Sequence, residues 1–158
     1  MTNFLIGRRD LLGAIFATIT FPGFAGSTWA AADSYPAIQA YRNPGCVCCE
    51  KWAEHLRQAG FTVTLEDDAA LDDRRTKAGV PAEITGCHTA FMGEYVIEGH
   101  VPVADIIRLL ALKPAIRGLA VSGMPMGSPG MENGDNKESF KVFAFKSEGT
   151  WEEFSNYS

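Results

Sequence analysis

The sequence lacks an excess of positive charge, with 14 lysine and arginine residues against 19 aspartate and glutamate residues. No basic stripe is present to meet phosphates, so nucleic acid is not expected as a partner. Long apolar runs are also scarce. Residues 11–25 are interrupted by Gly13 and Pro22 and fall short of the about 20 residues that a membrane span needs. The chain is 46% hydrophobic and 21% charged, which is the balance of an ordinary globular domain.

The first thirty or so residues have the pattern of an export signal. Arg8 and Arg9 precede the apolar run, as in twin-arginine signals, and "STWAAAD" offers small residues for cleavage near Ala30 or Ala32. An ordinary Sec signal is the alternative, and both routes lead to the periplasm. No cysteine follows the run, so no lipid anchor is indicated. We predict a signal peptide at residues 1–32 and a single periplasmic domain at residues 33–158, with no membrane contact in the mature form.

Hydrophobic periodicity predicts the secondary structure of this domain. The expected order is strand, helix, strand, helix, hairpin and helix, at residues 37–42, 48–60, 61–67, 68–81, 89–100 and 101–112. This is the order of thioredoxin and glutaredoxin, so we predict a thioredoxin-like α/β domain. In the first helix, Trp52 is expected in the core and His55 in solvent.

The last predicted helix is opened by Pro102, and its buried side is expected to consist of Ile106, Ile107, Leu109 and Leu110. A Gly/Pro/Met loop without regular structure is expected at residues 118–136. Two added strands, at 139–145 and 150–154, should follow it.

The four cysteines are few but concentrated. Cys46, Cys48 and Cys49 lie in "YRNPGCVCCEKW", between the first predicted strand and helix, where thioredoxin-like folds keep their redox pair. The helix N-terminus favours thiolates there. Cys87 and His88, in "GCHTAF", occupy the place where such folds normally carry a cis-proline that faces this pair. We therefore expect all four cysteines to converge on one spot.

Several kinds of chemistry fit converging cysteines. Two disulfides are ordinary in the oxidising periplasm, but a Cys48–Cys49 bridge would be strained and other pairings would crowd two bridges together. A thiol–disulfide oxidoreductase would use Cys46 and Cys49, which leaves Cys48 without a task. A structural zinc ion takes four thiolates, yet zinc sites usually space their cysteines as separated pairs. Adjacent cysteines suit thiolates that bridge several copper(I) ions.

Other candidate ligands lie outside the cysteine motif. "SGMPMGSPGME" contains Met124 and Met126 in an M-x-M pattern that copper(I) tolerates, although methionines also fill apolar gaps. His88 adjoins Cys87. His100 follows the hairpin on a loop at the same end of the fold, where a helix-capping or surface role is an equal alternative.

Three segments together resemble the CopG family of periplasmic copper-resistance proteins: "YRNPGCVCCEKWAEHLRQAGF", "GCHTAFMGEYVIEGHVPVADIIRLL" and "GLAVSGMPMGSPGME". The resemblance implies a thioredoxin-like fold with a role in copper tolerance, including copper(I)/copper(II) redox chemistry. It also implies that the four cysteines bind copper as a thiolate-bridged cluster. It leaves open which histidines and methionines are ligands.

We therefore predict a copper-binding protein that holds more than one copper(I) ion, with zinc as the alternative metal. Copper-dependent oxidoreductase activity is left open, and other periplasmic copper-resistance proteins are expected partners. The predicted metal ligands are Cys46, Cys48, Cys49, Cys87, His88, His100, Met124 and Met126.

The export signal can be tested by mass spectrometry of protein from the periplasm. We expect a new N-terminus between Ala30 and Asp33, because the small residues there suit a signal peptidase. Protein that keeps Met1 and stays in the cytosol would contradict the predicted localisation.

Overall fold

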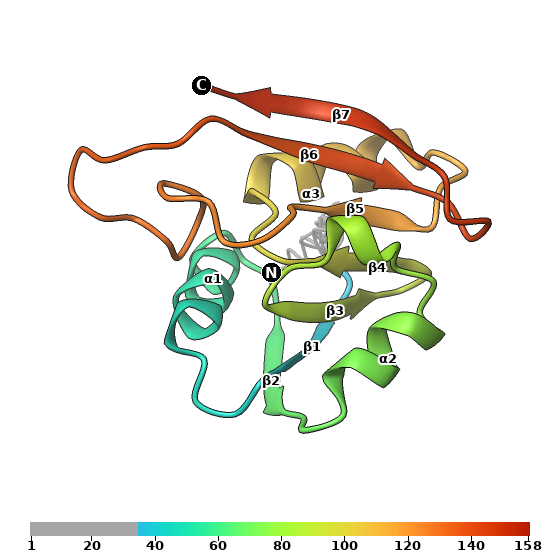
Figure 1. Cartoon of the computed structure of the whole chain (residues 1–158), viewed down its shortest axis with the longest axis horizontal. Helices are drawn as coiled ribbons and strands as arrows, with labels where there is room; N and C mark the ends of the chain where they lie inside the picture. Colours follow the sequence, from blue (N-terminus) through green and yellow to red (C-terminus); the bar gives the residue numbers. More distant parts are fainter. Residues whose placement is uncertain (1–34) are drawn as a thin grey trace, which may run out of the picture. The chain divides into compact units, whose positions relative to one another are not determined.

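The structure is a computed structural model that describes residues 35–158; the predicted signal peptide lies outside the described residues. The described part is a mixed α/β domain (Figure 1). Its elements are β1 (Ile38–Arg42), α1 (Val47–Gln58), β2 (Val63–Asp67), α2 (Leu71–Lys77), the short 3₁₀ helix η1 (Ala82–Ile84), β3 (His88–Met92), β4 (Tyr95–Glu98), α3 (Val103–Leu112), β5 (Gly118–Ala120), β6 (Phe140–Phe145) and β7 (Trp151–Tyr157). Within residues 35–158, no helix is both long enough and apolar enough to cross a membrane.

The strands form one seven-stranded sheet in the order β2-β1-β3-β4-β5-β6-β7. Strand β1 is parallel to β2, and α1 makes the crossover between them, as a parallel pair requires. Strand β1 is antiparallel to β3, with Arg42 opposite His88. Strand β4 is parallel to β5, and the other neighbouring pairs are antiparallel.

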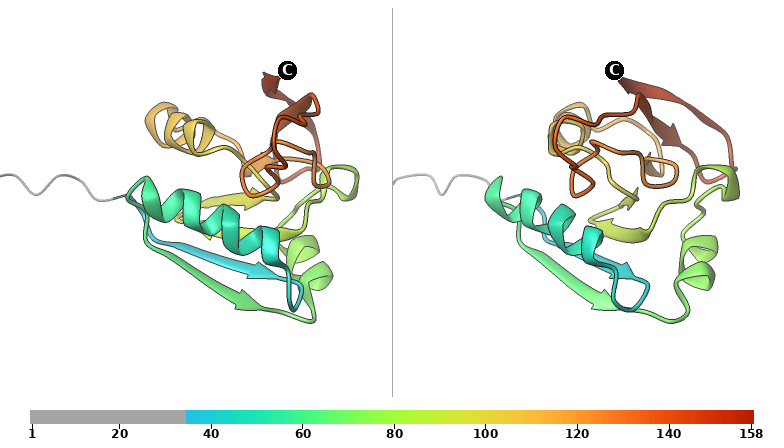
Figure 2. Two further views of the ribbon diagram at one scale, coloured as in Figure 1. Left: turned by 90° about the vertical axis from the view of Figure 1, so that its left-hand side faces the viewer. Right: turned by 60° about the vertical axis from the view of Figure 1, so that its left-hand side comes forward.

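The two faces of the sheet carry separate hydrophobic clusters because alternate strand residues point to opposite faces. Helices α1 and α3 lie over one face, and α2 lies over the other (Figure 2). Trp52 and Leu56 of α1 pack with Leu109 of α3 in the larger cluster. The smaller cluster, on the α2 side, contains Ala78, Val80, Ile84, Val96, Ala120 and Phe145.

Trp52 anchors α1 and is fully buried, as predicted. Its indole Nε1–H donates a hydrogen bond to the carbonyl of Val101, 3.0 Å away. The ring therefore fills the core while its one polar atom is satisfied. Because α1 begins at the cysteine motif, this anchor also fixes where the cysteines lie.

The predicted order of elements up to α3 is confirmed, but two predictions for the C-terminal half are wrong. The segment expected to be an irregular loop begins with β5, which pairs between β4 and β6. A three-residue strand is too short to show a period in the sequence. Gly118 is required there, because a Cβ at this position would collide with the backbone carbonyl of Val96.

The buried side of α3 also differs from the prediction. Ile107 is exposed, whereas Asp105 is buried. The Asp105 carboxylate accepts hydrogen bonds from the hydroxyls of Ser155 and Tyr157 at 2.8 Å each, and it pairs with Arg108. Burial and the hydrogen bond to Asp105 raise the pKa of Tyr157 to about 12. The carboxylate thus attaches β7 to α3, which a helical pattern alone does not indicate.

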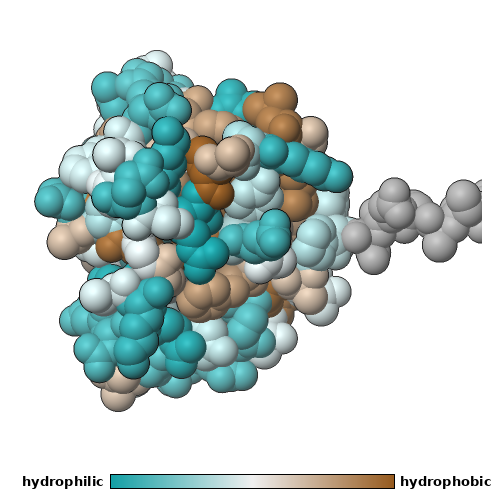
Figure 3. Space-filling model, turned by 90° about the vertical axis from the view of Figure 1, so that its right-hand side faces the viewer, coloured by the Kyte–Doolittle hydropathy of each residue, from teal (hydrophilic) through white to brown (hydrophobic). Residues whose placement is uncertain are grey.

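Apolar side chains do not gather into one large patch on the face shown in Figure 3. Hydrophilic residues cover most of that face, and the apolar ones form small separate groups. Among the described residues, the exposed large hydrophobic side chains include Val47 and Met124, which are 69% and 53% exposed. Both belong to segments that carry predicted metal ligands.

Candidate metal centre

The pairing of β1 with β3 explains why cysteines distant in sequence meet. Arg42, the last residue of β1, lies opposite His88, the first residue of β3. The chain leaving β1 and the chain entering β3 therefore start from the same end of the sheet. Cys46 is the N-cap residue of α1, Cys48 and Cys49 lie in its first turn, and Cys87 directly precedes β3.

The four sulfur atoms come together at this point. The Sγ atom of Cys48 lies 3.3 Å from that of Cys46 and 3.9 Å from that of Cys87. The Sγ atom of Cys49 lies 3.3 Å from that of Cys87. All four lie within 4.8 Å of one another, and we call these four side chains the cysteine cluster. The structure therefore brings the predicted cysteine ligands together, whereas their binding of a metal stays a prediction.

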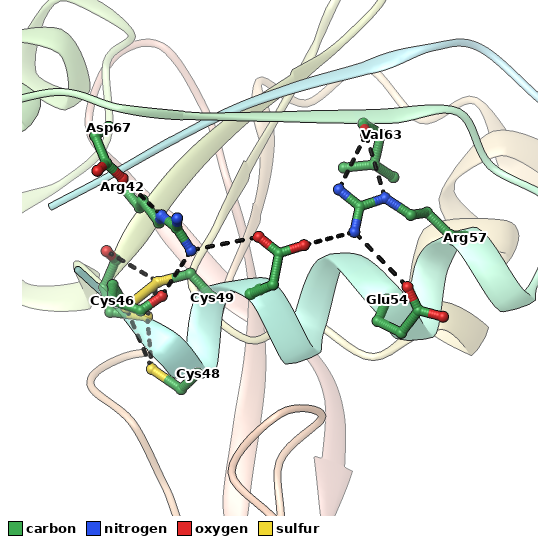
Figure 4. Close-up of polar contacts among 10 residues, drawn as sticks. Arg42, Cys46, Cys48, Cys49, Glu54, Arg57, Val63 and Asp67 are labelled. Atoms are coloured by element: carbon green, nitrogen blue, oxygen red, sulfur yellow. Dashed lines mark hydrogen bonds and ion pairs between the residues drawn. A yellow bond between two sulfur atoms is a disulfide. The ribbon is translucent and has the colours of Figure 1, made fainter. Parts of the chain in front are cut away.

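Two of these sulfurs are bonded to each other. Cys46 and Cys49 form a disulfide (Figure 4). Cys48 and Cys87 are free thiols. The Cα atoms of the bonded pair are 5.6 Å apart, an ordinary spacing for a bridge. The cluster thus contains one disulfide and two thiols, whereas the alternatives considered from the sequence were two disulfides or four thiolates. A metal ion bound by all four sulfurs therefore requires that this disulfide is reduced first.

A guanidinium holds the N-terminal end of α1 in place. Arg42 donates one hydrogen bond to the carbonyl of Cys46 at 2.9 Å and another to the carboxylate of Asp67 at 2.8 Å (Figure 4). It also lies 3.4 Å from the carboxylate of Glu50. The cluster is thus fixed to β1 and β2 through one side chain.

His100 presents a defined nitrogen to the cluster. Its Nδ1 lies 2.7 Å from the carbonyl oxygen of Pro129, and its Nε2 lies 2.8 Å from the Sγ atom of Cys87. A carbonyl only accepts hydrogen bonds, so Nδ1 carries the proton and the lone pair of Nε2 faces Cys87. A histidine held in this way has the orientation of a metal ligand.

His88 is fully buried beside the same sulfur. Its Nδ1 lies 3.3 Å from Cys87 Sγ, and its Nε2 has no hydrogen-bond partner among the described residues. The ring packs against Trp52 and against His100, with ring centroids 4.1 and 5.2 Å away. His88, His100 and Cys87 form a second group of close ligand atoms, so Cys87 belongs to both groups.

The protonation states of His88, His100 and Cys87 are compatible with metal binding in which the metal ion replaces a proton. Burial lowers the pKa of His88 and of His100, so both imidazoles are neutral, the form that binds metal. Burial, with the neighbouring Cys48, raises the pKa of the Cys87 thiol. The free protein therefore keeps a proton on Cys87, which an arriving metal ion must displace.

The segment of residues 121–132, here called the methionine loop, covers the cluster. The Sδ atom of Met124 lies 3.9 Å from the Sγ atom of Cys48, whereas no contact within residues 35–158 joins the side chain of Met126 to the sulfurs. Gly130 packs directly on α1, because a Cβ there would lie 2.6 Å from the carbonyl oxygen of Cys48. Glycine is needed at this close approach.

The methionine loop is also tied to α1 by a hydrogen-bonding contact between a histidine and a glutamate that the sequence did not indicate. Nε2 of His55 lies 2.7 Å from the carboxylate of Glu132, which also accepts the backbone N–H of Gly130. His55 was expected simply to be solvated. It is 42% exposed but has a defined partner.

Glu98 is a buried carboxylate that the sequence analysis missed. It accepts hydrogen bonds from the backbone N–H of Gly86 at 2.8 Å and from the hydroxyl of Thr89 at 2.6 Å, and Arg75 lies 3.6 Å away. Burial raises the pKa of this carboxyl. Because Gly86 precedes Cys87, Glu98 holds the backbone that carries the fourth sulfur. Its only signal in the sequence is a charged residue at the end of an apolar strand.

Thiols and imidazoles that meet at the end of β1 define the class of this protein. It is an α/β domain with a cysteine-rich site suited to soft metal ions.

Comparisons with known proteins identify the family. Residues 84–131 match the family described as "Protein of unknown function, DUF411". Two solved structures are similar over 78% of this chain at 37% identity: "Copper resistance protein copG- Form 2", with a TM-score of 0.75, and "Copper resistance protein copG- Form 1", with 0.74. The matches cover 99% and 98% of those chains. A comparison with curated proteins finds no match. The chain belongs to the CopG family of copper resistance proteins, which confirms the predicted resemblance.

The role of Glu98 can be tested by Glu98→Ala. This change leaves the N–H of Gly86 and the hydroxyl of Thr89 without their acceptor, so we expect the free energy of unfolding to fall by about 1–3 kcal/mol. Urea unfolding of the metal-free protein measures it. Glu94→Ala, in the exposed turn between β3 and β4, is the matched control and should change stability by less than about 0.5 kcal/mol. Equal stability of the two variants would show that Glu98 does not hold this loop.

Proposed function

We propose that this protein binds copper in the periplasm as part of copper resistance, and that it holds more than one copper(I) ion in a thiolate-bridged site. The observation that carries the proposal is the position of Cys87. Its sulfur lies in one ligand group with the three other cysteines and in a second with His88 and His100.

The donor atoms favour a soft ion. Thiolate and thioether ligands select copper(I) among common metal ions, and the cysteine cluster together with Met124 supplies both. Ligands about 2.3 Å from a tetrahedral ion lie about 3.8 Å apart. The free thiols of Cys48 and Cys87 are 3.9 Å apart, which fits two sulfurs on one ion. The two solved relatives are copper resistance proteins by name, which supports copper over zinc.

A shared sulfur supports more than one ion. A thiolate has lone pairs for two metal ions, and Cys87 lies between the other cysteines and the two imidazoles. One ion among the cysteines and one on the histidine side would both contact this sulfur. His100 would bind through Nε2, because its Nδ1 proton is held by Pro129. Met124 would add a thioether at the exposed side, next to Cys48.

The fold and the location belong to the same proposal. Strand β1 with the cysteine motif after it, the parallel β1–β2 pair, the β3–β4 hairpin and α3 follow the order of a thioredoxin-like domain, which β5, β6 and β7 extend. We propose that residues 1–32 direct export and are then removed. Other copper-resistance proteins of the periplasm would supply or accept the copper.

A second function is favoured by the Cys46–Cys49 disulfide. A C-x-x-C bridge at the N-terminus of a helix is the arrangement of a thiol–disulfide oxidoreductase. That function gives no task to Cys48 and Cys87. The sulfur of Cys48 lies 3.3 Å from the Cys46 end of the disulfide, and the sulfur of Cys87 lies 3.3 Å from the Cys49 end. Copper binding accounts for all four.

Copper content of cysteine variants tests the proposal. Reduced wild-type protein purified without oxygen from copper-supplied cells should contain more than one copper per chain by elemental analysis. Cys87→Ser should lose bound copper or weaken binding by more than the roughly 10–100-fold typical of losing a group that only orients a ligand. Cys48→Ser should do the same.

Val47→Ala is the matched control, because Val47 lies inside the cysteine motif with an exposed side chain that offers no ligand atom. It should bind copper as the wild type does, and circular dichroism of each metal-free variant checks that it folds. Wild-type copper content in both Cys48→Ser and Cys87→Ser would refute the four-cysteine site. One zinc per chain that copper(I) does not displace would identify a structural zinc protein instead.

A further inference from the structure

His88 and His100 both lie against the sulfur of Cys87, but their outer nitrogens have different surroundings. Nδ1 of His100 donates its proton to the carbonyl oxygen of Pro129 at 2.7 Å, and its Nε2 faces the sulfur at 2.8 Å. Nδ1 of His88 faces the same sulfur at 3.3 Å, whereas its Nε2 is buried and has no hydrogen-bond partner within residues 35–158. The two imidazoles therefore offer the site different chemistry.

The hydrogen bonds around Cys87 fix which atoms carry protons. Because the proton of His100 is on Nδ1, its Nε2 can only accept, and the thiol of Cys87 donates to it. The thiol proton is then used, so the sulfur presents only lone pairs to His88. A bare Nδ1 at 3.3 Å would set two lone pairs against each other. The single proton of the neutral His88 ring therefore lies on Nδ1, which donates to the sulfur.

These contacts form one chain of hydrogen bonds that runs in a single direction. It starts at Nδ1–H of His88, which donates to the sulfur of Cys87, whose S–H donates to Nε2 of His100. From there, Nδ1–H of His100 donates to the carbonyl of Pro129. The atom left without a partner is the Nε2 lone pair of His88, so no N–H group in this chain is buried without an acceptor.

Direct coordination of a metal ion by His88 would break this arrangement. A metal ion on Nδ1 leaves the ring proton on Nε2, because a ligating imidazole is neutral. That N–H would then be buried without an acceptor, which is costly for folding. Histidine ligands almost always donate their other N–H to an oxygen, as His100 does to Pro129 and as His88 does not.

The ring of His88 is also held in its present orientation. The side chain is fully buried, and its ring centroid lies 4.1 Å from that of Trp52 and 5.2 Å from that of His100. Its backbone is fixed as well, because the carbonyl of His88 accepts the N–H of Gly99 at 2.8 Å. The Nδ1–H group therefore points at the sulfur before any metal ion binds.

We propose that His100 is the imidazole ligand of copper in this group and that His88 is a positioning residue, which donates its Nδ1–H to the thiolate of Cys87. This inference rests on the proposed copper-binding function. When copper(I) binds, the thiol proton of Cys87 passes to water, a copper–sulfur bond forms, and Nε2 of His100 is released to bind copper; no electron is transferred. The N–H of His88 stays on the sulfur, where it stabilises the buried negative charge and leaves lone pairs for two copper ions.

Nuclear magnetic resonance of protein with isotope-labelled ring nitrogens tests the inference on the wild type. Long-range proton–nitrogen correlation shows which nitrogen of each ring carries the proton. In the metal-free protein we expect the proton on Nδ1 of both His88 and His100. After loading with copper(I) without oxygen, the Nε2 resonance of His100 should move, and Nε2 of His88 should stay a bare nitrogen. A proton on Nε2 of His88 in the copper-loaded protein would overturn the inference.

Substitutions separate support of the sulfur from coordination of copper. His88→Leu removes the donor and should weaken copper(I) binding by roughly 10–100-fold. His88→Asn keeps an N–H group near the place of Nδ1 and should bind copper(I) more tightly than His88→Leu. X-ray absorption should show the same nitrogen contribution around copper in the wild type and in His88→Leu, whereas His100→Leu should lose it. Nitrogen lost in His88→Leu and kept in His100→Leu would overturn the inference.

Failure of the proposed function would look different from failure of this inference. Reduced wild-type protein that binds no copper(I), while both rings carry their proton on Nδ1, would refute the proposed function and support the proton positions assigned around Cys87. Copper(I) bound through the nitrogens of both His88 and His100 would overturn the inference and leave the proposed function standing.

Discussion

The antiparallel pairing of β1 with β3 is the constraint on which the site depends. It places Arg42 opposite His88 and so brings together the chain that carries three cysteines and the chain that carries the fourth. The same arginine then reaches the N-cap carbonyl of α1. A slip of one residue in this register would turn the side chain of His88 to the other face of the sheet and move Cys87 away from its partners.

Close packing around Cys87 leaves the loop little freedom. Gly86 lies against the backbone of Gly99, and any side chain there would collide with it. The carboxylate of Glu98 accepts a hydrogen bond from the N–H of Gly86, and Nε2 of His100 faces the sulfur of Cys87. Because Glu98, Gly99 and His100 are consecutive residues, one short segment both supports the backbone before Cys87 and places an imidazole nitrogen beside its sulfur.

The order of the secondary-structure elements and the position of the cysteine site could be predicted from the sequence, because the information for both is local. The periodicity of α1 and the alternation of the first four strands gave the order of elements, and the spacing of the cysteine motif indicated one site. Non-local features could not be predicted. The carboxylates of Asp105 and Glu98 are buried because their partners come from β7 and from the Cys87 loop, and no pattern in the sequence pairs them. The choice of Cys46 and Cys49 as the bonded pair, and the partnership of His55 with Glu132, likewise depend on positions in space.

We propose that one group of sulfurs holds several copper(I) ions. X-ray absorption at the copper edge, on reduced protein loaded without oxygen, tests this most directly because it reports the atoms around copper itself. We expect sulfur as the main neighbour, a smaller contribution from imidazole nitrogen, and a second copper ion close to the first. Copper surrounded only by nitrogen and oxygen, with no neighbouring copper, would contradict it.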